Sequence, residues 1–279
     1  MTTPLRLRLH SVHTLDVSQK MKKKISTVSL ISLSFLIILM YTLGCATTPS
    51  FEEGYQPKAT LSPERIENSR LVVLVHGIFG HGKRLNPLTE ALEANGYVCF
   101  APDLKPNSAY HGIEDLALKL EAEINARWGQ SAEFAIVSFS MGGIVSRYYL
   151  QELDGAQRCE ALVTISSPHN GTAIAYALPG RGIEEMRPGS NLLEKLNSEN
   201  SLMALQDIPI YSYYMPFDEI IVPARSSEWE LAQNQKFLPS LHPLIFYKAK
   251  VQEKLIEDLD LAFTEKRIGM TNQSVFTTP

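Results

Sequence analysis

Residues 133–143, with the sequence Glu-Phe-Ala-Ile-Val-Ser-Phe-Ser-Met-Gly-Gly, lead directly from a predicted strand at 133–138 into a predicted helix at 142–150. Both segments belong to a longer alternation of strands and helices. Such alternation implies βαβ units and a doubly wound, mainly parallel sheet with helices on both faces, that is, an α/β fold in one domain. The other expected strands are 71–75, 97–101, 161–165 and 210–214, and the other expected helices are 86–94, 113–128 and 243–261.

Composition excludes several classes of protein. The chain has 279 residues, of which 44% are hydrophobic, and this excludes a disordered or fibrous protein. A net charge of −4 gives no basic excess, so nucleic acid is not an expected partner. The three cysteines, Cys45, Cys99 and Cys159, are too few for a disulfide framework and have no metal-ligand spacing. No metal or other cofactor is expected.

Ser140 stands in the sharp turn between the strand and the helix. Ligands of open parallel sheets bind at the carboxyl ends of the strands, where this turn lies. Taken alone, a serine among glycines also fits an ordinary turn or a helix N-cap. The stretch 138–143, however, resembles the GxSxG nucleophile elbow, which needs small residues two positions before and two after the serine. Gly142 meets this need, and Ser138 replaces the usual first glycine.

A second motif, Val-His-Gly-Ile at positions 75–78, follows the first predicted strand. Together with the elbow it resembles the lipases of the α/β-hydrolase superfamily. That resemblance implies that the backbone N–H groups of Ile78 and Met141 form an oxyanion hole. It also implies that His76 and Gly77 support the loop structurally. A P-loop is the alternative reading, because 77–83 fits GxxxxGK, but Arg84 stands where Ser or Thr should bind magnesium.

The resemblance also implies the order serine, acid, histidine along the chain. Two histidines follow Ser140. His169 lies in Ser-Ser-Pro-His-Asn-Gly-Thr at 166–172, which leaves no room for a strand bearing the acid, so a structural role is expected for it. His242 opens the last expected helix, after all the other elements, and is the expected general base.

The acid should end a strand between these points. The predicted strand 210–214 is followed by Met-Pro-Phe-Asp-Glu-Ile-Ile-Val-Pro at 215–223. Asp218 is the expected acid, because the lipases that the chain resembles carry a D-x-x-V-x-P-like loop at this point; its role is to orient the histidine. Glu219 is the alternate carboxylate. The expected catalytic triad is thus Ser140, Asp218 and His242.

The resemblance implies a lipase or esterase that hydrolyses carboxylic esters of acyl lipids as a monomer. A thioesterase or an acyltransferase could use the same triad, and a non-catalytic surface lipoprotein could retain the fold. Between residues 172 and 207 lies an insert that either forms a small helical cap over the site or adds to the core. It contains Leu192, Leu193, Leu196, Leu202 and Leu205, which could line such a cap.

The amino terminus predicts export. Residues 21–44 start with Met-Lys-Lys-Lys and continue with an apolar run, which resembles a bacterial lipoprotein signal peptide with Cys45 as the lipidated residue. An uncleaved signal anchor is the alternative, and Met21 is an alternative start. Cleavage removes six basic residues and one acidic residue, and so changes the net charge from −4 to −9. The protein is expected on the periplasmic side of the outer membrane or on the cell surface.

The expected layout has four parts: a signal peptide at 1–44, a lipidated tether at 45–69, an α/β-hydrolase domain at 70–265 with the insert at 172–207, and a tail at 266–279. The tether is polar and contains three prolines, which suits an extended connection.

Overall fold

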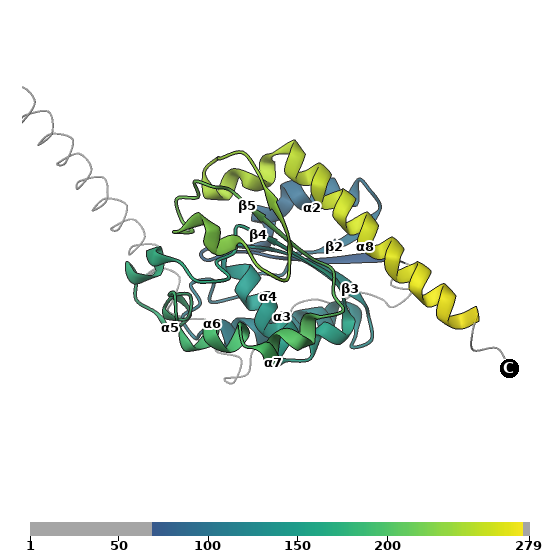
Figure 1. The fold of residues 1–279 in the computed structure, drawn as a ribbon, viewed down its shortest axis with the longest axis horizontal. Helices are drawn as coiled ribbons and strands as arrows, with labels where there is room; N and C mark the ends of the chain where they lie inside the picture. The colour runs from purple at the N-terminus through teal and green to yellow at the C-terminus, as the bar shows by residue number, and fades with distance from the viewer. Residues whose placement is uncertain (1–68, 276–279) are drawn as a thin grey trace, which may run out of the picture. The chain divides into compact units, whose positions relative to one another are not determined.

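Six parallel strands form one sheet in the order β2-β1-β3-β4-β5-β6 (Figure 1). The computed structural model describes residues 69–275, with side chains as far as residue 264, and all of them belong to the unit Gly44–Pro279. The predicted signal peptide, Cys45 and most of the tether lie outside the described residues. The strands are β1 (Arg70–Val75), β2 (Tyr97–Phe100), β3 (Phe134–Phe139), β4 (Cys159–Ile165), β5 (Ile210–Tyr214) and β6 (Gln233–Lys236).

The register of the sheet gathers the ends of these strands at one edge. Neighbouring strands pair Val75 with Ser138, Ser138 with Thr164, Thr164 with Ser212, and Ser212 with Asn234. β1, β3 and β4 are mainly apolar on both faces, as expected for parallel strands that are covered on both sides. The segments that leave the carboxyl ends of these strands therefore start from one common edge.

Helices cover both faces of the sheet, as the alternation predicts (Figure 1). Helices α2 (Asn86–Glu93) and α8 (Ala249–Val275) lie on one face, and α3 (Ile113–Trp128) and α4 (Met141–Glu152) on the other. The first face holds a core cluster that includes Leu88, Leu92, Leu255 and Leu259. The expected α/β fold is confirmed.

Two elements differ from the sequence prediction. β6 was not expected, because its sequence Gln-Asn-Gln-Lys carries no apolar residue; it is an edge strand that pairs only with β5 and needs no apolar face. The last helix was expected at 243–261. It consists of a 3-10 helix, η7 (His242–Tyr247), followed by α8, which continues to Val275 through part of the predicted tail.

The insert between 172 and 207 forms short helices, α5 (Arg181–Glu185), α6 (Asn191–Leu196) and α7 (Glu199–Leu202). They lie on the α3–α4 side of the sheet (Figure 1). Leu193, Leu196 and Leu205 are buried, so these three leucines belong to the packed interior. Among the described residues, no helix has the length and apolar character that crossing a membrane requires.

Candidate active site

Ser140 has the backbone geometry of a sharp strand-to-helix turn. Its φ is 55° and its ψ −125°, in a region that a residue with a Cβ rarely adopts. The turn is held from both sides: the Ser140 N–H donates to the carbonyl of Ile165 at 2.9 Å, and the Gly143 N–H donates to the Ser140 carbonyl at 3.0 Å. A strained conformation that the surroundings enforce is typical of a functional position.

Close packing explains the small residues around Ser140. A Cβ on Gly142 would lie 2.4 Å from the carbonyl oxygen of Val75, and a Cβ on Gly77 would lie 2.9 Å from the Cβ of Ser140. Gly142 is therefore required by its contact with backbone. At the other small position, the Ser138 hydroxyl is buried and donates to the Val163 carbonyl at 3.4 Å, so a serine fits where the elbow usually has glycine.

His76 supports the loop that follows β1. Its Nδ1 lies 2.9 Å from the Gly77 carbonyl and its Nε2 3.0 Å from the Leu104 N–H, which identifies the proton on Nδ1 and the acceptor on Nε2. Burial lowers the pKa of His76, so the ring is neutral at pH 7. With both nitrogens engaged, His76 has no free lone pair to act as a base.

The same loop presents a free backbone donor. The N–H of Phe79 donates to Asn107 and that of Gly80 to Gly77, whereas the N–H of Ile78 has no acceptor in the described part of the chain. Met141 is the first residue of α4, and an N–H in the first turn of a helix has no partner within the helix. These are the two groups predicted to form the oxyanion hole.

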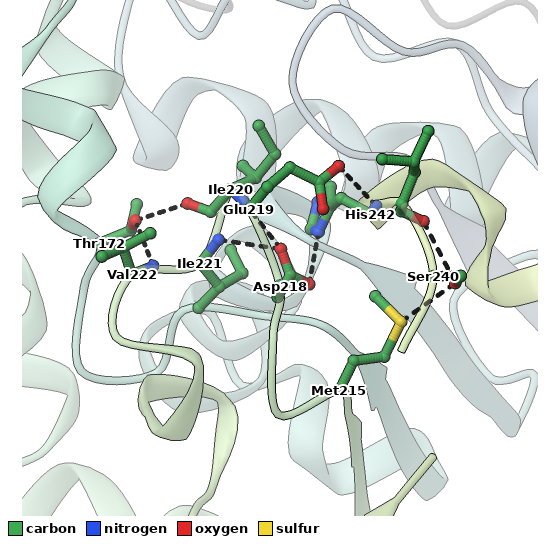
Figure 2. Close-up of polar contacts among 10 residues, drawn as sticks. Thr172, Met215, Asp218, Glu219, Ile220, Ile221, Val222, Ser240 and His242 are labelled. Carbon is green, nitrogen blue, oxygen red and sulfur yellow. Dashed lines mark hydrogen bonds and ion pairs between the residues drawn. The ribbon is translucent and has the colours of Figure 1, made fainter. Parts of the chain in front are cut away.

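Asp218 and His242 form a buried pair (Figure 2). The Asp218 Oδ2 lies 2.8 Å from the His242 Nδ1, and its Oδ1 accepts the N–H groups of Ile220 at 2.9 Å and Ile221 at 3.0 Å. Burial opposes ionisation of this carboxyl, but the hydrogen bond and charge of His242 and the two backbone donors outweigh it and lower the Asp218 pKa. The carboxylate is thus ionised at neutral pH and fixed in orientation.

Two contacts around this pair escaped the sequence analysis. Glu219, expected only as an alternate carboxylate, accepts the backbone N–H of His242 through Oε1 at 2.8 Å. Thr172 braces the acid loop, because its hydroxyl donates to the Ile220 carbonyl at 2.6 Å and accepts the Val222 N–H at 3.0 Å (Figure 2). The position of Glu219 beside Asp218 was the one available signal; Thr172 offered none.

The remaining nitrogen of His242, Nε2, is buried and has no hydrogen-bond partner among the described residues. The imidazole packs on Phe139, the residue before Ser140, with ring centroids 4.7 Å apart. The hydrogen bond between Ser140 and His242 is therefore not formed, although the Asp218–His242 bond is. A catalytic serine must come within about 2.6–3.2 Å of its base, a geometry that often tightens only when substrate binds.

His169 lies in a different environment. It is fully buried, its Nε2 is 3.0 Å from the Thr164 hydroxyl, and its ring stacks on Trp229 with centroids 4.6 Å apart. Burial, and then the charge of Arg147, lower its pKa well below the ordinary value. Arg147 also contacts Trp229, because its guanidinium carbon lies 4.3 Å from the centre of the Trp229 ring. His169 is thus held in the interior by one hydrogen bond and by ring stacking, and its Nδ1 has no hydrogen-bond partner among the described residues.

A parallel sheet with a serine in a strained turn after β3, an aspartate after β5 and a histidine after β6 defines the α/β-hydrolase fold. The model of the family described as palmitoyl protein thioesterase matches residues 71–204. A comparison with curated proteins gives no match.

Solved structures of similar fold include two lipases and a further protein. Lipase BlEst2 of Bacillus licheniformis, in its mature form, superposes with a TM-score of 0.56 at 17% identity, over 74% of this chain and 96% of that one. Lipase B of Aspergillus fumigatus superposes with a TM-score of 0.59 at 14% identity, over 75% of this chain and 59% of that one. Est1E of Butyrivibrio proteoclasticus superposes with a TM-score of 0.51 at 14% identity, over 71% of this chain and 90% of that one.

Proposed function

We propose that the chain is a serine hydrolase that cleaves carboxylic ester bonds of acyl lipids through an acyl-enzyme on Ser140. The observation that carries the proposal is the buried Asp218–His242 pair, whose Nε2 is unpartnered beside the turn that holds Ser140. An ionised, fixed carboxylate on Nδ1 keeps the proton on that nitrogen, and Nε2 is then the basic one.

The reaction that follows has two halves. His242 takes the hydroxyl proton as Ser140 Oγ attacks the ester carbonyl, and the Ile78 and Met141 N–H groups stabilise the oxyanion. The imidazolium returns the proton to the leaving alcohol, and the carbonyl carbon stays bonded to Oγ. Water then attacks this acyl-enzyme with His242 as base, and the acid product and free Ser140 result. No step needs a metal or another cofactor.

Acyl chains are the substrate class that the comparisons favour. Two of the structures of similar fold are named lipases, and the matching family is described as palmitoyl protein thioesterase. The family match makes an acyl thioester the second candidate, because a serine acyl-enzyme can form from either bond. An acyltransferase and a protein that retains the fold without activity are the remaining outcomes.

The test is turnover of p-nitrophenyl esters with acyl chains from C2 to C16, and of a palmitoyl thioester at equal concentration. Wild type, Ser140→Ala and His242→Ala are compared, with fluorophosphonate labelling of Ser140 as a second measurement. We expect ester turnover that is lost in both variants and an optimum at long chains. Faster turnover of the thioester would reassign the substrate, and the absence of both turnover and labelling would indicate a binding protein.

We further propose that the protein is exported and lipidated at Cys45, which supports a location at the periplasmic side of the outer membrane or at the cell surface. The support is the sequence of residues 21–45. Growth with radiolabelled palmitate should label wild type but not Cys45→Ser. Equal labelling of both would reject lipidation at this residue, and the absence of label from wild type would leave the uncleaved signal anchor.

A further inference from the structure

One peptide unit connects Thr172 to the carboxylate of Asp218. The carbonyl of Ile220 and the N–H of Ile221 belong to the same planar peptide. The Thr172 hydroxyl donates to this carbonyl at 2.6 Å, and the N–H at the other end donates to the Asp218 Oδ1 at 3.0 Å (Figure 2). The other carboxylate oxygen lies 2.8 Å from the His242 Nδ1. A continuous chain of three hydrogen bonds therefore leads from Thr172 to the imidazole.

The direction of this chain is fixed at the Thr172 hydroxyl. A hydroxyl has one proton to donate and two lone pairs that can accept. Two backbone N–H groups use the lone pairs, that of Val222 at 3.0 Å and that of Ile174 at 3.3 Å. The proton therefore belongs to the bond with the Ile220 carbonyl. A donor on a carbonyl oxygen polarises the peptide, so the N–H at the other end becomes the stronger donor to the carboxylate.

Backbone hydrogen bonds hold Thr172 against the acid loop, residues 215–223. The Ala173 N–H donates to the Val222 carbonyl at 2.8 Å, so both backbone polar groups of Val222 are bound by this pair of residues. On its other side the Thr172 N–H donates to the carbonyl of Met186, directly after α5, at 2.9 Å. The acid loop belongs to no helix or strand, so its position depends on contacts of this kind.

We propose that Thr172 is a positioning residue, whose hydroxyl acts through one peptide unit of the acid loop to fix the Asp218 carboxylate against the His242 imidazole. Without the hydroxyl this peptide loses the partner of its carbonyl, and the N–H that it aims at Asp218 Oδ1 is no longer held in direction. The effect on turnover rests on the proposed serine hydrolase. The effect on the Asp218–His242 hydrogen bond can be measured without turnover.

Ser190 offers a matched control, because it caps another helix of the insert with the same kinds of contact. Its hydroxyl donates to the Glu185 carbonyl at 2.6 Å and accepts the Leu193 N–H at 3.3 Å. The corresponding bonds of Thr172, one to a carbonyl and one from a helix N–H, have the same two lengths. Both partners of Ser190 lie within the insert, so Ser190→Ala leaves the chain to Asp218 intact.

The first test is kinetic and uses the full chain. Thr172→Val removes the hydroxyl and keeps the shape of the side chain, whereas Thr172→Ser keeps the hydroxyl. With p-nitrophenyl esters we expect kcat of Thr172→Val to fall by about 10- to 100-fold, the scale of a misplaced catalytic group, while KM stays within about twofold of wild type. Thr172→Ser and Ser190→Ala should both keep most of the wild-type kcat. Thr172→Ala replaces Thr172→Val if that variant fails to fold.

The second test observes the Asp218–His242 hydrogen bond by proton NMR. A proton on His242 Nδ1 that is bonded to a carboxylate resonates at low field, and the loss of this signal in His242→Ala assigns it. In Thr172→Val we expect the signal to move to higher field and to exchange with solvent about tenfold faster or more, because the bond opens more often. Thr172→Ser and Ser190→Ala should keep the wild-type signal.

Several results would overturn the proposal. An unchanged kcat in an active enzyme, or an unchanged low-field signal, in Thr172→Val would show that the hydroxyl does not position the acid. Equal losses in Ser190→Ala would assign the effect to loosening of the insert, and losses in Thr172→Ser equal to those in Thr172→Val would assign it to packing of the methyl group. Absence of the signal from wild type would show that the Asp218–His242 bond is not formed. If wild type has no turnover, the proposed hydrolysis fails and the NMR comparison still decides the role of Thr172.

Discussion

Replacing Asp218 by asparagine tests how the site orients its base. The substitution keeps the size of the side chain, and its carbonyl oxygen can still accept the N–H groups of Ile220 and Ile221, now at 2.9 and 3.0 Å from Oδ1. These two donors fix the amide, so its NH₂ group must face the His242 Nδ1. That nitrogen then has to accept a hydrogen bond, and the imidazole proton moves to Nε2. In this tautomer His242 cannot take the proton of Ser140.

The expected loss is about 10⁴-fold in kcat, the scale of a wrong histidine tautomer in a serine triad, or about 5.5 kcal/mol of transition-state stabilisation. Replacing the charge-assisted bonds by neutral ones should lower the free energy of unfolding by only about 1–2 kcal/mol. Ester hydrolysis at saturating substrate measures the first quantity, and urea unfolding measures the second. A large kinetic loss with little loss of stability distinguishes orientation from folding.

Glu219→Gln is the control, because the amide oxygen of glutamine can still accept the His242 backbone N–H. We expect this variant to keep activity within about tenfold of wild type, because the hydrogen bond remains and only the negative charge of its acceptor is lost. The reasoning is refuted if Asp218→Asn also stays within tenfold, or if Glu219→Gln loses as much as Asp218→Asn. The second result would show that the contact of Glu219 with the His242 backbone matters as much as the contact of Asp218 with the His242 ring.

Three further predictions concern the fold around the site. Gly142→Ala should lower the free energy of unfolding by about 1–3 kcal/mol and abolish activity, because its Cβ would lie 2.4 Å from the Val75 carbonyl oxygen. The control is Gly129→Ala, at φ 81° with nothing within 4 Å, which should lower the free energy of unfolding by about 1–2 kcal/mol and leave activity intact. Equal effects of the two substitutions on activity would contradict this prediction. Ser138→Gly restores the usual elbow glycine and should cost about 0.5–1 kcal/mol in urea unfolding while kcat stays near wild type; a large change in kcat would give the Ser138 hydroxyl a catalytic part. His169 has a folded-state pKa well below 6.5, so its contribution to stability is present above pH 6.5 and is lost as pH falls below it, by up to about 1.4 kcal/mol per pH unit. The free energy of unfolding should therefore change less steeply between pH 7 and pH 5 in His169→Gln than in wild type. Identical slopes in the two proteins would disprove the linkage.

The sequence predicted the fold where hydrophobic runs are long and failed where they are absent. β1, β3 and β4 are buried on both faces, and such strands need continuous apolar sequence. β6 sits at the sheet edge with the sequence Gln-Asn-Gln-Lys, whose position is set by pairing with β5 and not by burial. The 3-10 helix before α8 was merged with it, since a boundary between two helix types leaves no clear mark in apolar spacing.

The site shows the same division. Ser140, Asp218 and His242 could be proposed because chain order and strand ends restrict which residues can meet. The structure brings Asp218 and His242 into contact and packs His242 on the residue before Ser140. Glu219 could not be assigned, because its partner is a backbone N–H that lies 23 residues away in sequence. Contacts to backbone carry no side-chain pattern and are invisible to motif comparison.

The buried Arg147 sets a condition on any attempt to exchange the insert between related enzymes. Its guanidinium has no carboxylate partner in the described part of the chain, and it donates to the Leu196 carbonyl at 2.6 Å and the Asn197 side chain at 2.8 Å, both contributed by the insert. A chimaera with a foreign segment at 172–207 would remove these two acceptors and leave the buried cation with only the Gln151 side chain at 2.9 Å and the His169 carbonyl at 3.4 Å. Such a graft must supply a carbonyl and an amide at these two places, or be combined with an apolar replacement of Arg147.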